Sequence, residues 1–278
     1  MNRNQSIAGI VLTLNEEKDI GRALRSLAWC DELLVVDSGS VDSTQEIVEQ
    51  LGVRFVQHIQ TPPFLITEQR NWALNNPYLK SEWVLFLDAD EEVGDNLALQ
   101  IRDCINSPDG FDAYELTPRY WFFGQWLKRT QGFPNWHPRL LRRSVVKFQG
   151  GVWESFTDNA TIQRIYTPYE HYAFSKGINE WINKHLRYAD QEAADVIQYY
   201  ATHGSSAFST TRSLKLRILA SYAWPFRPLA RFIQKYVLQF GFTESWQGLL
   251  FSLLMSFYEL IVVIKILEAR VRLQKKSL

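Results

Sequence analysis

Cysteine is scarce in this sequence: its 278 residues contain Cys30 and Cys104 and no others. The two do not form a CxxC pair, which disfavours both a disulfide-stapled secreted fold and a zinc ribbon. The apolar stretch near the N-terminus, residues 7–14, is short and no small-residue cleavage site follows it, so the sequence indicates no signal peptide. We therefore expect a protein of a reducing compartment.

The phosphate-binding and catalytic motifs of several common enzyme classes are also missing. The sequence has no GxGxxG after its first apolar run and no GxxxxGK[ST] anywhere, so it lacks the phosphate turns of the dinucleotide-binding fold and of the P-loop proteins. HExxH and GxSxG are absent, and the five histidines do not have the spacing of metal ligands. These absences disfavour the enzyme classes that depend on those motifs.

The zero net charge hides an uneven distribution of charge along the chain. Residues 1–118 carry 8 Lys or Arg against 20 Asp or Glu, residues 119–202 carry 11 against 7, and residues 203–278 carry 11 against 3. Hydrophobic residues (46%) and charged residues (22%) are otherwise at ordinary globular levels, which excludes a disordered or collagen-like chain. An acidic N-terminal part followed by a basic C-terminal part favours a membrane surface or a nucleic acid as the partner of the C-terminal part.

Strand and helix patterns alternate in the first part of the chain. Apolar, β-branched runs predict strands at residues 7–14, 32–37, 53–58 and 82–88. Apolar residues at helical spacing predict helices at residues 20–27, 43–51, 67–74 and 97–105. Strands separated by helices need crossover connections, so the pattern predicts an α/β fold with a doubly wound, mostly parallel sheet. Ligands of such folds bind at the carboxyl ends of the strands.

Acidic residues follow three of these predicted strands. They are the segment Asn15-Glu16-Glu17, Asp37, and the pair Asp88 and Asp90. Two carboxylates at the end of a buried strand suit a divalent cation, which can offset charge on a nucleoside-diphosphate leaving group. The structural alternative is that Asp serves there as a turn or cap residue. Glu91 and Glu92 either extend the acidic cluster or cap the helix at residues 97–105.

Four short segments, taken in order, resemble the successive motifs of glycosyltransferase family 2. They are Thr13 to Glu17 (TLNEE), Val35 to Thr44 (VVDSGSVDST), Gln69 to Asn71 (QRN) and Leu87 to Glu91 (LDADE). The resemblance is closest to the bacterial branch that contains the lipopolysaccharide core β-1,4-glucosyltransferases. Residues 120–126, 138–143 and 240–244 also resemble segments of that branch, so the resemblance covers nearly the whole chain.

The resemblance implies a GT-A fold, inversion at the anomeric carbon and a nucleotide-sugar donor, with UDP-glucose as the expected one. It also implies a divalent cation, Mg²⁺ or Mn²⁺. Asp88 is implied to face the ribose or the sugar of the donor, and Asp90 is implied to coordinate the metal.

Further donor contacts are implied for the earlier motifs. Thr13, Asn15 and Glu16 are implied to lie near the base and the ribose. Asp37 is implied to bind the nucleoside, and Arg70 to contact the nucleotide. A solvated arginine is the structural alternative for Arg70.

An inverting transfer needs a general base that deprotonates the acceptor hydroxyl as it attacks the anomeric carbon. Residues 150–156 resemble a family segment usually written with Val-His-Glu, which makes Glu154 the candidate base. Trp153 stands where a His is usual. A surface acid in a loop is the structural alternative for Glu154, and Asp158 is the next candidate base.

Aromatic and basic residues are concentrated in residues 119–156. They are Arg119, Trp121, Trp126, Lys128, Arg129, Trp136, Arg139, Arg142, Arg143 and Trp153. Aromatic faces suit sugar rings and cations suit phosphates, so this segment predicts acceptor binding, while some of the aromatic residues can simply be core. Nucleic acid is disfavoured as a partner because the first part is acidic and no RNA-binding motif is present.

Two C-terminal stretches predict a membrane-associated helical region. In the first, Arg227, Arg231 and Lys235 repeat every four residues opposite an apolar side, which is typical of helices among anionic lipid headgroups. The second, residues 248–267, has the length of a bilayer span, but Glu259 near its middle favours a monotopic helix. We expect its small polar stripe to pack on protein: Ser245, Gly248, Ser252, Ser256 and Glu259. A soluble helical subdomain, buried in a dimer, is the alternative.

We predict a metal-dependent inverting glycosyltransferase that moves a hexose from a nucleotide sugar to a lipid-linked, lipopolysaccharide or other envelope glycan. The predicted divisions are a nucleotide-sugar-binding half (1–118), an acceptor-binding half (119–202) and a helical membrane-associated region (203–278). Basic residues after the last apolar helix favour the cytoplasmic face of the inner membrane, as a peripheral or monotopic protein. The alternatives are a non-catalytic, glycosyltransferase-like membrane-associated binding protein and a nucleotidyltransferase, which would normally carry a Gly-rich turn after its first strand. The sequence does not indicate an oligomeric state.

Overall fold

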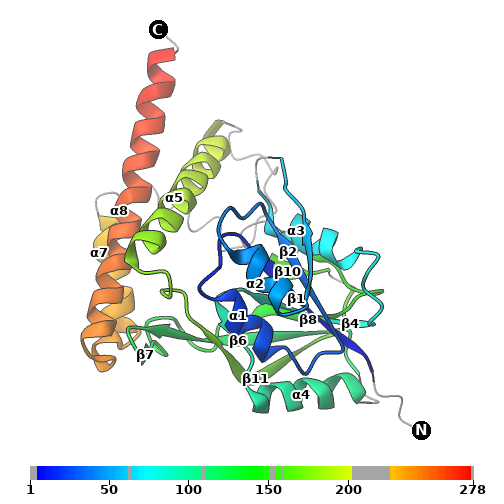
Figure 1. Ribbon diagram of the computed structural model, residues 1–278. Helices are drawn as coiled ribbons and strands as arrows, with labels where there is room; N and C mark the ends of the chain where they lie inside the picture. The colour runs from blue at the N-terminus through cyan, green and yellow to red at the C-terminus, as the bar shows by residue number, and fades with distance from the viewer. Residues whose placement is uncertain are drawn as a thin grey trace. The chain divides into compact units, whose positions relative to one another are not determined.

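The computed structural model describes residues 5–61, 64–107, 110–150, 154–157, 159–201 and 226–276. The chain divides into two compact units (Figure 1). Unit 1 consists of Met1–Trp121 and Phe133–Ser175, and unit 2 of Phe122–Gly132 and Lys176–Leu278. Unit 2 therefore takes one segment from the middle of the chain and one from its end. The functional divisions after residues 118 and 202 stay predictions.

The strands and helices predicted for the first part of unit 1 are confirmed, with bounds that shift by one or two residues. The strands are β1 (Ile7–Thr13), β2 (Glu32–Asp37), β3 (Arg54–Gln57) and β4 (Trp83–Asp88). The helices are α1 (Ile20–Ser26), α2 (Thr44–Gln50), α3 (Ile66–Leu74) and α4 (Asp95–Asn106).

The sheet continues into strands that the sequence pattern does not predict. They are β5 (Glu91–Glu92), β6 (Ala113–Phe122), β8 (His137–Arg142) and β11 (Ile162–His171). The order across the sheet is β3-β2-β1-β4-β8-β6-β11-β5. The pairs β3/β2, β2/β1, β1/β4 and β6/β11 are parallel, whereas β8 is antiparallel to both its neighbours. The predicted α/β class with a mostly parallel sheet is therefore confirmed.

The order of the first four strands creates a switch point at one edge of the sheet. The chain moves from β1 to β2 and β3 on one side and then returns to place β4 on the other side of β1. At such a point the connections leave in opposite directions from the carboxyl ends of two adjacent strands, which opens a crevice for ligands. Here the switch point lies beyond Thr13 and Asp88.

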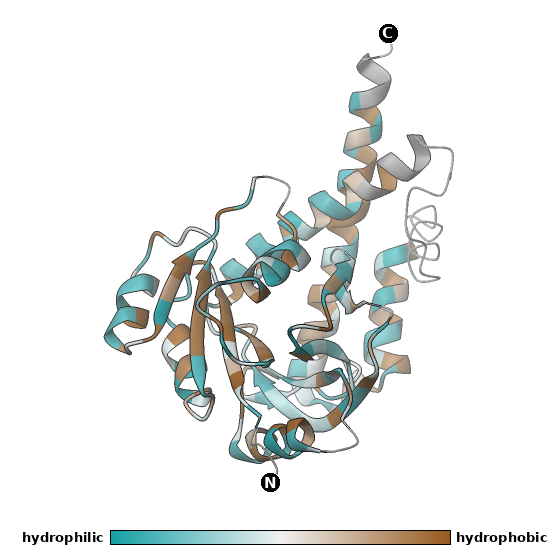
Figure 2. Ribbon diagram, turned by 90° about the vertical axis from the view of Figure 1, so that its right-hand side faces the viewer, coloured by the Kyte–Doolittle hydropathy of each residue, from teal (hydrophilic) through white to brown (hydrophobic). Residues whose placement is uncertain are grey.

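Both faces of the sheet are covered at β1, β2 and β4, which explains why these strands read as apolar runs. One core cluster joins the sheet to α1, α2 and α4, and the other joins it to α3 and to a hairpin of β9 (Phe148–Gly150) and β10 (Glu154–Phe156). Figure 2 shows several brown strands in the sheet beside teal and white ones. Ile10, Val35 and Phe86 have no exposed surface, and full burial of such a side chain contributes about 1.5–3 kcal/mol.

Unit 2 is helical. Its elements are β7 (Gln125–Trp126), α5 (Ile178–Ala201), α7 (Phe226–Phe232), the π-helix η1 (Ile233–Leu238), the 3₁₀-helix η2 (Gly241–Thr243) and α8 (Ser245–Lys276). Residues 202–225, including part of the predicted basic helical region, lie outside the described residues. Buried side chains of α5 and α8 form a small apolar core between these two helices.

The 240–244 segment has a structural role within unit 2. The Glu244 carboxylate accepts hydrogen bonds from the backbone N–H groups of Arg129 (2.5 Å) and Thr130 (3.0 Å) and from the Thr130 hydroxyl (2.7 Å). A Cβ atom on Gly241 would lie 2.6 Å from Thr130 Cγ2, so the close approach requires glycine there. These contacts bind the 122–132 segment to the start of α8.

The basic residues of α7 point toward acids of the protein, which corrects the expectation that they face lipid headgroups. Arg227 Nε lies 2.5 Å from Glu259 Oε2, and Arg227 Nη2 lies 2.7 Å from Glu192 Oε1. Arg231 pairs with the other oxygen of Glu259. The Lys235 ammonium donates to the Thr130 carbonyl, and burial lowers the pKa of Lys235 to about 8. The repeat of every four residues therefore reflects an internal ionic layer.

The polar stripe of α8 packs on protein as expected. Gly248 and Ser252 are buried, Glu259 is 1% exposed, and the Ser256 hydroxyl donates to the Pro228 carbonyl, whereas Ser245 is exposed. On a neighbouring side of the helix, large apolar residues of α8 are exposed: Trp246, Leu249, Leu253, Phe257, Ile264, Leu267 and Val271. Within the part of the chain that the structure describes, α8 has the length and composition to cross a membrane.

Removal of the Glu259 charge tests the internal ionic layer. Glu259→Gln removes the counter-charge that the buried Arg227, which keeps its pair with Glu192, shares with the partly exposed Arg231. Loss of one partner from a buried ion pair costs about 3–5 kcal/mol. We expect urea denaturation to show a lower free energy of unfolding by that amount. Glu268→Gln breaks the exposed pair with Arg272 and should change it by less than about 1 kcal/mol. Equal effects of the two substitutions would contradict a buried role for Glu259.

Candidate active site

The carboxyl ends of β1, β2 and β4 bring together residues from three of the four motifs. Thr13 is in register with Asp37, and Leu12 is in register with Asp88. Thr13 and Asp37 are buried, and Asp88 lies at the strand end beside the switch point. Asp37 and Asp88, far apart in the sequence, thus share one edge of the sheet.

The loop that follows β1 is bonded to the loop that follows β2. Asn15 adopts a left-handed conformation (φ 56°), and its N–H donates to Ser40 Oγ at 2.7 Å. Its side-chain oxygen accepts from the Val41 N–H at 2.9 Å, and the Glu16 N–H donates to Thr44 Oγ1 at 2.8 Å. The first two motifs therefore form one surface at the carboxyl edge.

Asp37 organises the small-residue turn after β2. Its Oδ2 accepts from the N–H groups of Gly39 and Ser40, both at 2.8 Å, and from the Gln57 side chain at 3.2 Å. Its Oδ1 accepts from the Ser40 hydroxyl at 2.5 Å. Both oxygens of this buried carboxylate are engaged inside the protein, so it holds the turn in place. Its direct contact with the nucleoside stays a prediction.

Two arginines and two carboxylates form a closed ring of alternating charge, which we call the four-residue ring: Arg70, Asp88, Arg139 and Glu154. Arg70 lies 3.3 Å from Asp88 Oδ1 and 2.8 Å from Glu154 Oε2. Arg139 lies 3.0 Å from Asp88 Oδ2 and 4.0 Å from Glu154 Oε1. Each carboxylate thus faces both guanidinium groups. Side chains from α3, β4, β8 and β10 meet in this ring.

Three side chains of the ring are buried or nearly so, whereas the Asp88 side chain is 36% exposed. Arg70 is 1% exposed and lies over the rings of Phe86 and Phe148, with Cζ-to-centroid distances of 5.2 and 5.3 Å. The side chain of Glu154 is 15% exposed, so Glu154 is not a surface acid and Arg70 is not a solvated arginine. Trp153 and Asp158 lie outside the described residues.

Glu91 lies behind the ring, which corrects the suggestion that it caps a helix. It belongs to β5 and has no exposed surface, whereas α4 begins after Gly94. Its Oε2 accepts from the Asp88 N–H at 2.9 Å, and its Oε1 accepts from Arg139 at 2.6 Å. Glu91 therefore fixes both the end of β4 and the orientation of Arg139.

Burial and nearby charges shift the pKa values of Asp88 and Glu91 in opposite directions. Burial opposes ionisation of Asp88, but the guanidinium groups of Arg139 and Arg70 outweigh it and lower the pKa of Asp88 to about 2. For Glu91, burial and the nearby Asp88 charge outweigh Arg139 and raise the pKa to about 7. The carboxylate that faces the switch point is thus the strongly ionised one.

Arg139 has further support from β8 and β11. The Tyr169 ring centroid lies 5.6 Å from Arg139 Cζ, and the Tyr169 hydroxyl lies 2.9 Å from Nδ1 of His137. Burial, with Arg139 close by, lowers the pKa of His137 to about 3, so its imidazole is neutral. The sequence placed Arg139 in a basic and aromatic segment and in the family-like segment 138–143, without a role in the site. Its place in the ring depends on the antiparallel pairing of β8 with β4.

Asp90 lies beside a histidine that sequence reasoning set aside. The Asp90 Oδ2 atom is 3.4 Å from His171 Nε2, and His171 lies in β11 in register with Glu91 and Tyr120. A carboxylate suits Mg²⁺ or Mn²⁺, and one carboxylate with one imidazole leaves further positions for diphosphate oxygens and water. The described residues contain no group of three or more His, Cys, Asp or Glu side chains that could hold a metal, and coordination of a cation by Asp90 stays a prediction.

The basic and aromatic segment at residues 119–156 does not form one surface. Trp126, Lys128 and Arg129 belong to unit 2. Arg142 is in register with Trp83 at the start of β4, so it lies at the end of the strand opposite Asp88. Arg119 and Trp121 both contact Glu170, at 3.0 and 2.6 Å. The segment thus separates into structurally distinct groups, of which Arg139 joins the acidic edge.

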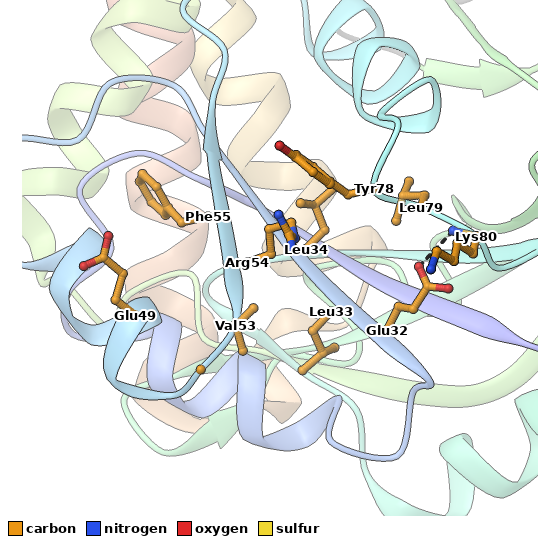
Figure 3. Close-up of a pocket in the computed structure, with 11 residues that line it drawn as sticks. Glu32, Leu33, Leu34, Glu49, Val53, Arg54, Phe55, Tyr78, Leu79 and Lys80 are labelled. Atoms are coloured by element: carbon orange, nitrogen blue, oxygen red, sulfur yellow. Dashed lines mark hydrogen bonds between the residues drawn. The ribbon is translucent and has the colours of Figure 1, made fainter.

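A surface pocket of about 580 Å³ opens at the other end of the strands (Figure 3). Glu32 at the start of β2 accepts a hydrogen bond there from the Lys80 N–H at 2.9 Å, and Arg54 lies 3.9 Å over the Tyr78 ring. None of the described residues that line the pocket is a predicted site residue. Because donor sites of open sheets lie at carboxyl ends, we do not assign the donor to this pocket.

Two solved structures show a weak overall similarity to the chain. TarS of S. aureus, residues 1–349, has a TM-score of 0.45 and 16% identity and covers 94% of this chain and 89% of its own. Glucosyl-3-phosphoglycerate synthase of Mycobacterium tuberculosis, in complex with Mn²⁺, UDP and phosphoglyceric acid, has a TM-score of 0.39 and 20% identity. That match covers 50% of this chain and 56% of the other, which is less than two thirds of its length.

Sequence comparison is more direct. The chain is 27% identical over 262 residues to an uncharacterised glycosyltransferase of Rickettsia bellii (strain RML369-C), covering 89% of this chain and 83% of that protein. It is 25% identical over 147 residues to the lipopolysaccharide core biosynthesis glycosyltransferase LpsC of Rhizobium meliloti (strain 1021), covering 51% and 53%. Residues 10–160, more than half of the chain, match the family model described as glycosyl transferase family 2. The acidic strand ends and the switch point lie within the matched segment. The chain belongs to glycosyltransferase family 2.

Proposed function

We propose that this glycosyltransferase transfers a hexose from a nucleotide sugar to a lipid-linked or lipopolysaccharide glycan, with inversion at the anomeric carbon and with help from Mg²⁺ or Mn²⁺. The observation that supports this most is the meeting of Asp88, Asp90 and Glu154 at one edge of the sheet, with a buried guanidinium between Asp88 and Glu154. UDP-glucose is the donor to test first because of the resemblance to the glucosyltransferase branch. The lipopolysaccharide acceptor is supported by the similarity to LpsC.

The proposed step is a single displacement. Glu154 accepts the proton of the acceptor hydroxyl while the hydroxyl oxygen forms a bond to the anomeric carbon. The bond between that carbon and the phosphate oxygen breaks, and its electron pair leaves with the nucleoside diphosphate. Asp88 holds the donor from the strand end, and Asp90 with His171 would hold the cation. The bound cation would offset the charge that develops on the leaving diphosphate.

Loss of the Asp90 carboxylate should remove metal-supported transfer. We expect Asp90→Ala to lower kcat/KM for UDP-glucose by at least about 100-fold, because metal ions supply several kcal/mol of transition-state stabilisation. Chelation of the wild type should do the same, and Mn²⁺ should restore activity. The matched control, Asp103→Ala, removes an exposed carboxylate on α4 and should have no effect.

A thermal-shift series separates donor binding from chemistry. A ligand that binds only the folded protein raises its melting temperature, so UDP-glucose should stabilise the wild type more with Mn²⁺ than without it. Full transfer activity in the presence of chelator would overturn the metal-dependent mechanism. A panel in which no nucleotide sugar stabilises the protein would overturn the assignment of the donor site.

Glu154 can be tested separately as the base. Glu154→Gln keeps the size of the side chain but removes its ability to accept a proton, so we expect kcat to fall about 10²- to 10⁴-fold. The thermal shift with UDP-glucose and Mn²⁺ should persist, because the donor-binding residues are unchanged. Turnover within a factor of about three of the wild type would move the base to another residue.

We also propose that unit 2 attaches the enzyme to the cytoplasmic face of the inner membrane. The support is the exposed apolar side of α8 together with the exposed aromatic residues Phe240 and Phe242 just before it. Because Arg227 and Arg231 pair with acids inside the protein, apolar insertion and not headgroup charge should supply most of the attraction. Glu259 and its partners occupy the inward side, which favours a helix lying in the interface over a span.

Vesicle binding tests this attachment. The triple variant Trp246→Ser, Leu253→Ser, Phe257→Ser removes three side chains of the exposed apolar side, each about half exposed. Since burial of each contributes about 1.5–3 kcal/mol, we expect co-sedimentation with phosphatidylethanolamine and phosphatidylglycerol vesicles to weaken at least about 100-fold. The control Leu99→Ser changes an exposed apolar residue on α4 and should bind as the wild type does. Undiminished binding of the triple variant would contradict attachment through α8.

A further inference from the structure

The four-residue ring joins two carboxylates to which the proposed function gives different tasks. Asp88 faces the donor, and Glu154 receives the proton of the acceptor. Arg70 spans from Asp88 Oδ1 (3.3 Å) to Glu154 Oε2 (2.8 Å), so one side chain contacts both groups. Arg139 reaches the other oxygen of each carboxylate. The separation of donor carboxylate and base is therefore set by two guanidinium groups.

The two arginines do not hold Glu154 equally. The Arg70 Nε atom is in ion-pair contact with Oε2 at 2.8 Å, whereas Arg139 Nη1 is 4.0 Å from Oε1, beyond hydrogen-bond distance. Arg139 is instead close to Asp88 Oδ2 (3.0 Å) and Glu91 Oε1 (2.6 Å). Arg70 thus contacts the base and shares Asp88 with Arg139, whereas the close contacts of Arg139 are with Asp88 and Glu91. Oε1 is the oxygen of Glu154 whose contact with the ring's guanidinium groups is beyond hydrogen-bond distance.

Burial keeps both arginines in this arrangement. Arg70 is 1% exposed between the rings of Phe86 and Phe148, and Arg139 is 3% exposed. A buried guanidinium that left its carboxylates would leave uncompensated charges inside the protein, at a cost of several kcal/mol. Neither side chain can therefore swing out to grip a substrate without breaking the ring.

We propose that Arg70 and Arg139 are positioning residues with separate duties: Arg70 turns Oε1 of Glu154 toward the acceptor hydroxyl, and Arg139 holds Asp88 for the donor. This inference rests on the proposed function, because it takes Glu154 as the base and Asp88 as a donor contact. It replaces the expectation that Arg70 acts by touching the nucleotide itself. It assigns the two arginines effects on different kinetic constants.

The division of duties appears in steady-state kinetics with UDP-glucose and Mn²⁺. Arg70→Gln should lower kcat about 10- to 100-fold with little change in donor KM, because a misplaced catalytic group can cost about 100-fold. Arg139→Gln should mainly raise the donor KM, because it releases Asp88. Arg70→Lys and Arg139→Lys keep the charge but lack the planar guanidinium that contacts two carboxylates at once. If a Gln variant fails to fold, the Lys variants should show the same effects, on kcat for Arg70 and on donor KM for Arg139.

A double-mutant cycle distinguishes positioning from other roles. In the Glu154→Gln background, Arg70→Gln should lower kcat by less than about threefold, because its effect passes through a base that is already gone. Arg139→Gln should still raise the donor KM in that background. The control Arg102→Gln, which removes the pair of Arg102 with Asp31 away from the ring, should leave both constants unchanged. Melting temperatures of all variants identify losses that come from unfolding.

The outcomes are distinct. Multiplicative losses of kcat from Arg70→Gln and Glu154→Gln, or a loss from Arg70 that appears in donor KM alone, would overturn the positioning role of Arg70 and leave the base in place. A Glu154→Gln variant with full turnover would overturn the base, and the positioning role with it. Normal kcat in Arg70→Lys would show that charge alone suffices and that orientation by the fork is not used.

Discussion

The structure depends on the neutralisation of acids that converge on one sheet edge. A doubly wound sheet directs the ends of β1, β2 and β4 to the same place, and here two of those strands end in Asp. Carboxylates so close together inside a protein repel each other and lose hydration. Hydrogen bonds from its own turn compensate the Asp37 carboxylate for lost hydration, and ion pairs with Arg70 and Arg139 do so for Asp88. Arg70 from the acidic part of the chain and Arg139 from the later strand β8 together supply the cations that face Asp88.

Much of unit 1 could be predicted because its information is local. Strands covered on both faces are continuous apolar runs, and the helices between them carry apolar residues at helical spacing, so β1 to β4 and α1 to α4 follow from short windows of sequence. Strand β11 could not be found in this way, since its residues are mostly partly or fully exposed and follow no regular alternation. For Glu91 the sequence left two roles open, because an acid shortly before a helix fits a cap as well as an extension of the acidic cluster. The structure places it in the cluster beside Asp88.

The site was predicted less completely than the fold. The motifs named the carboxylates and Arg70, which lie on or beside the predicted strands. Arg139 and His171 come from β8 and β11, and their positions depend on strand pairing across 50 to 80 residues of chain, which no local pattern reveals. The basic residues of α7 were recognised in the sequence, but their partner was not. The same spacing of cations is expected whether they face lipid or the buried Glu259.

Because the chain passes from unit 1 to unit 2 and back, a truncation affects the contacts of both segments of unit 2. The chain leaves unit 1 after Trp121, contributes residues 122–132 to unit 2, and returns to unit 1 before β8. A truncation after residue 175 would therefore not yield a clean catalytic fragment. It would leave Phe122 without Phe251 and the Arg129 and Thr130 amides without the Glu244 carboxylate. Point substitutions on the exposed side of α8 leave these contacts in place, whereas deletion removes them.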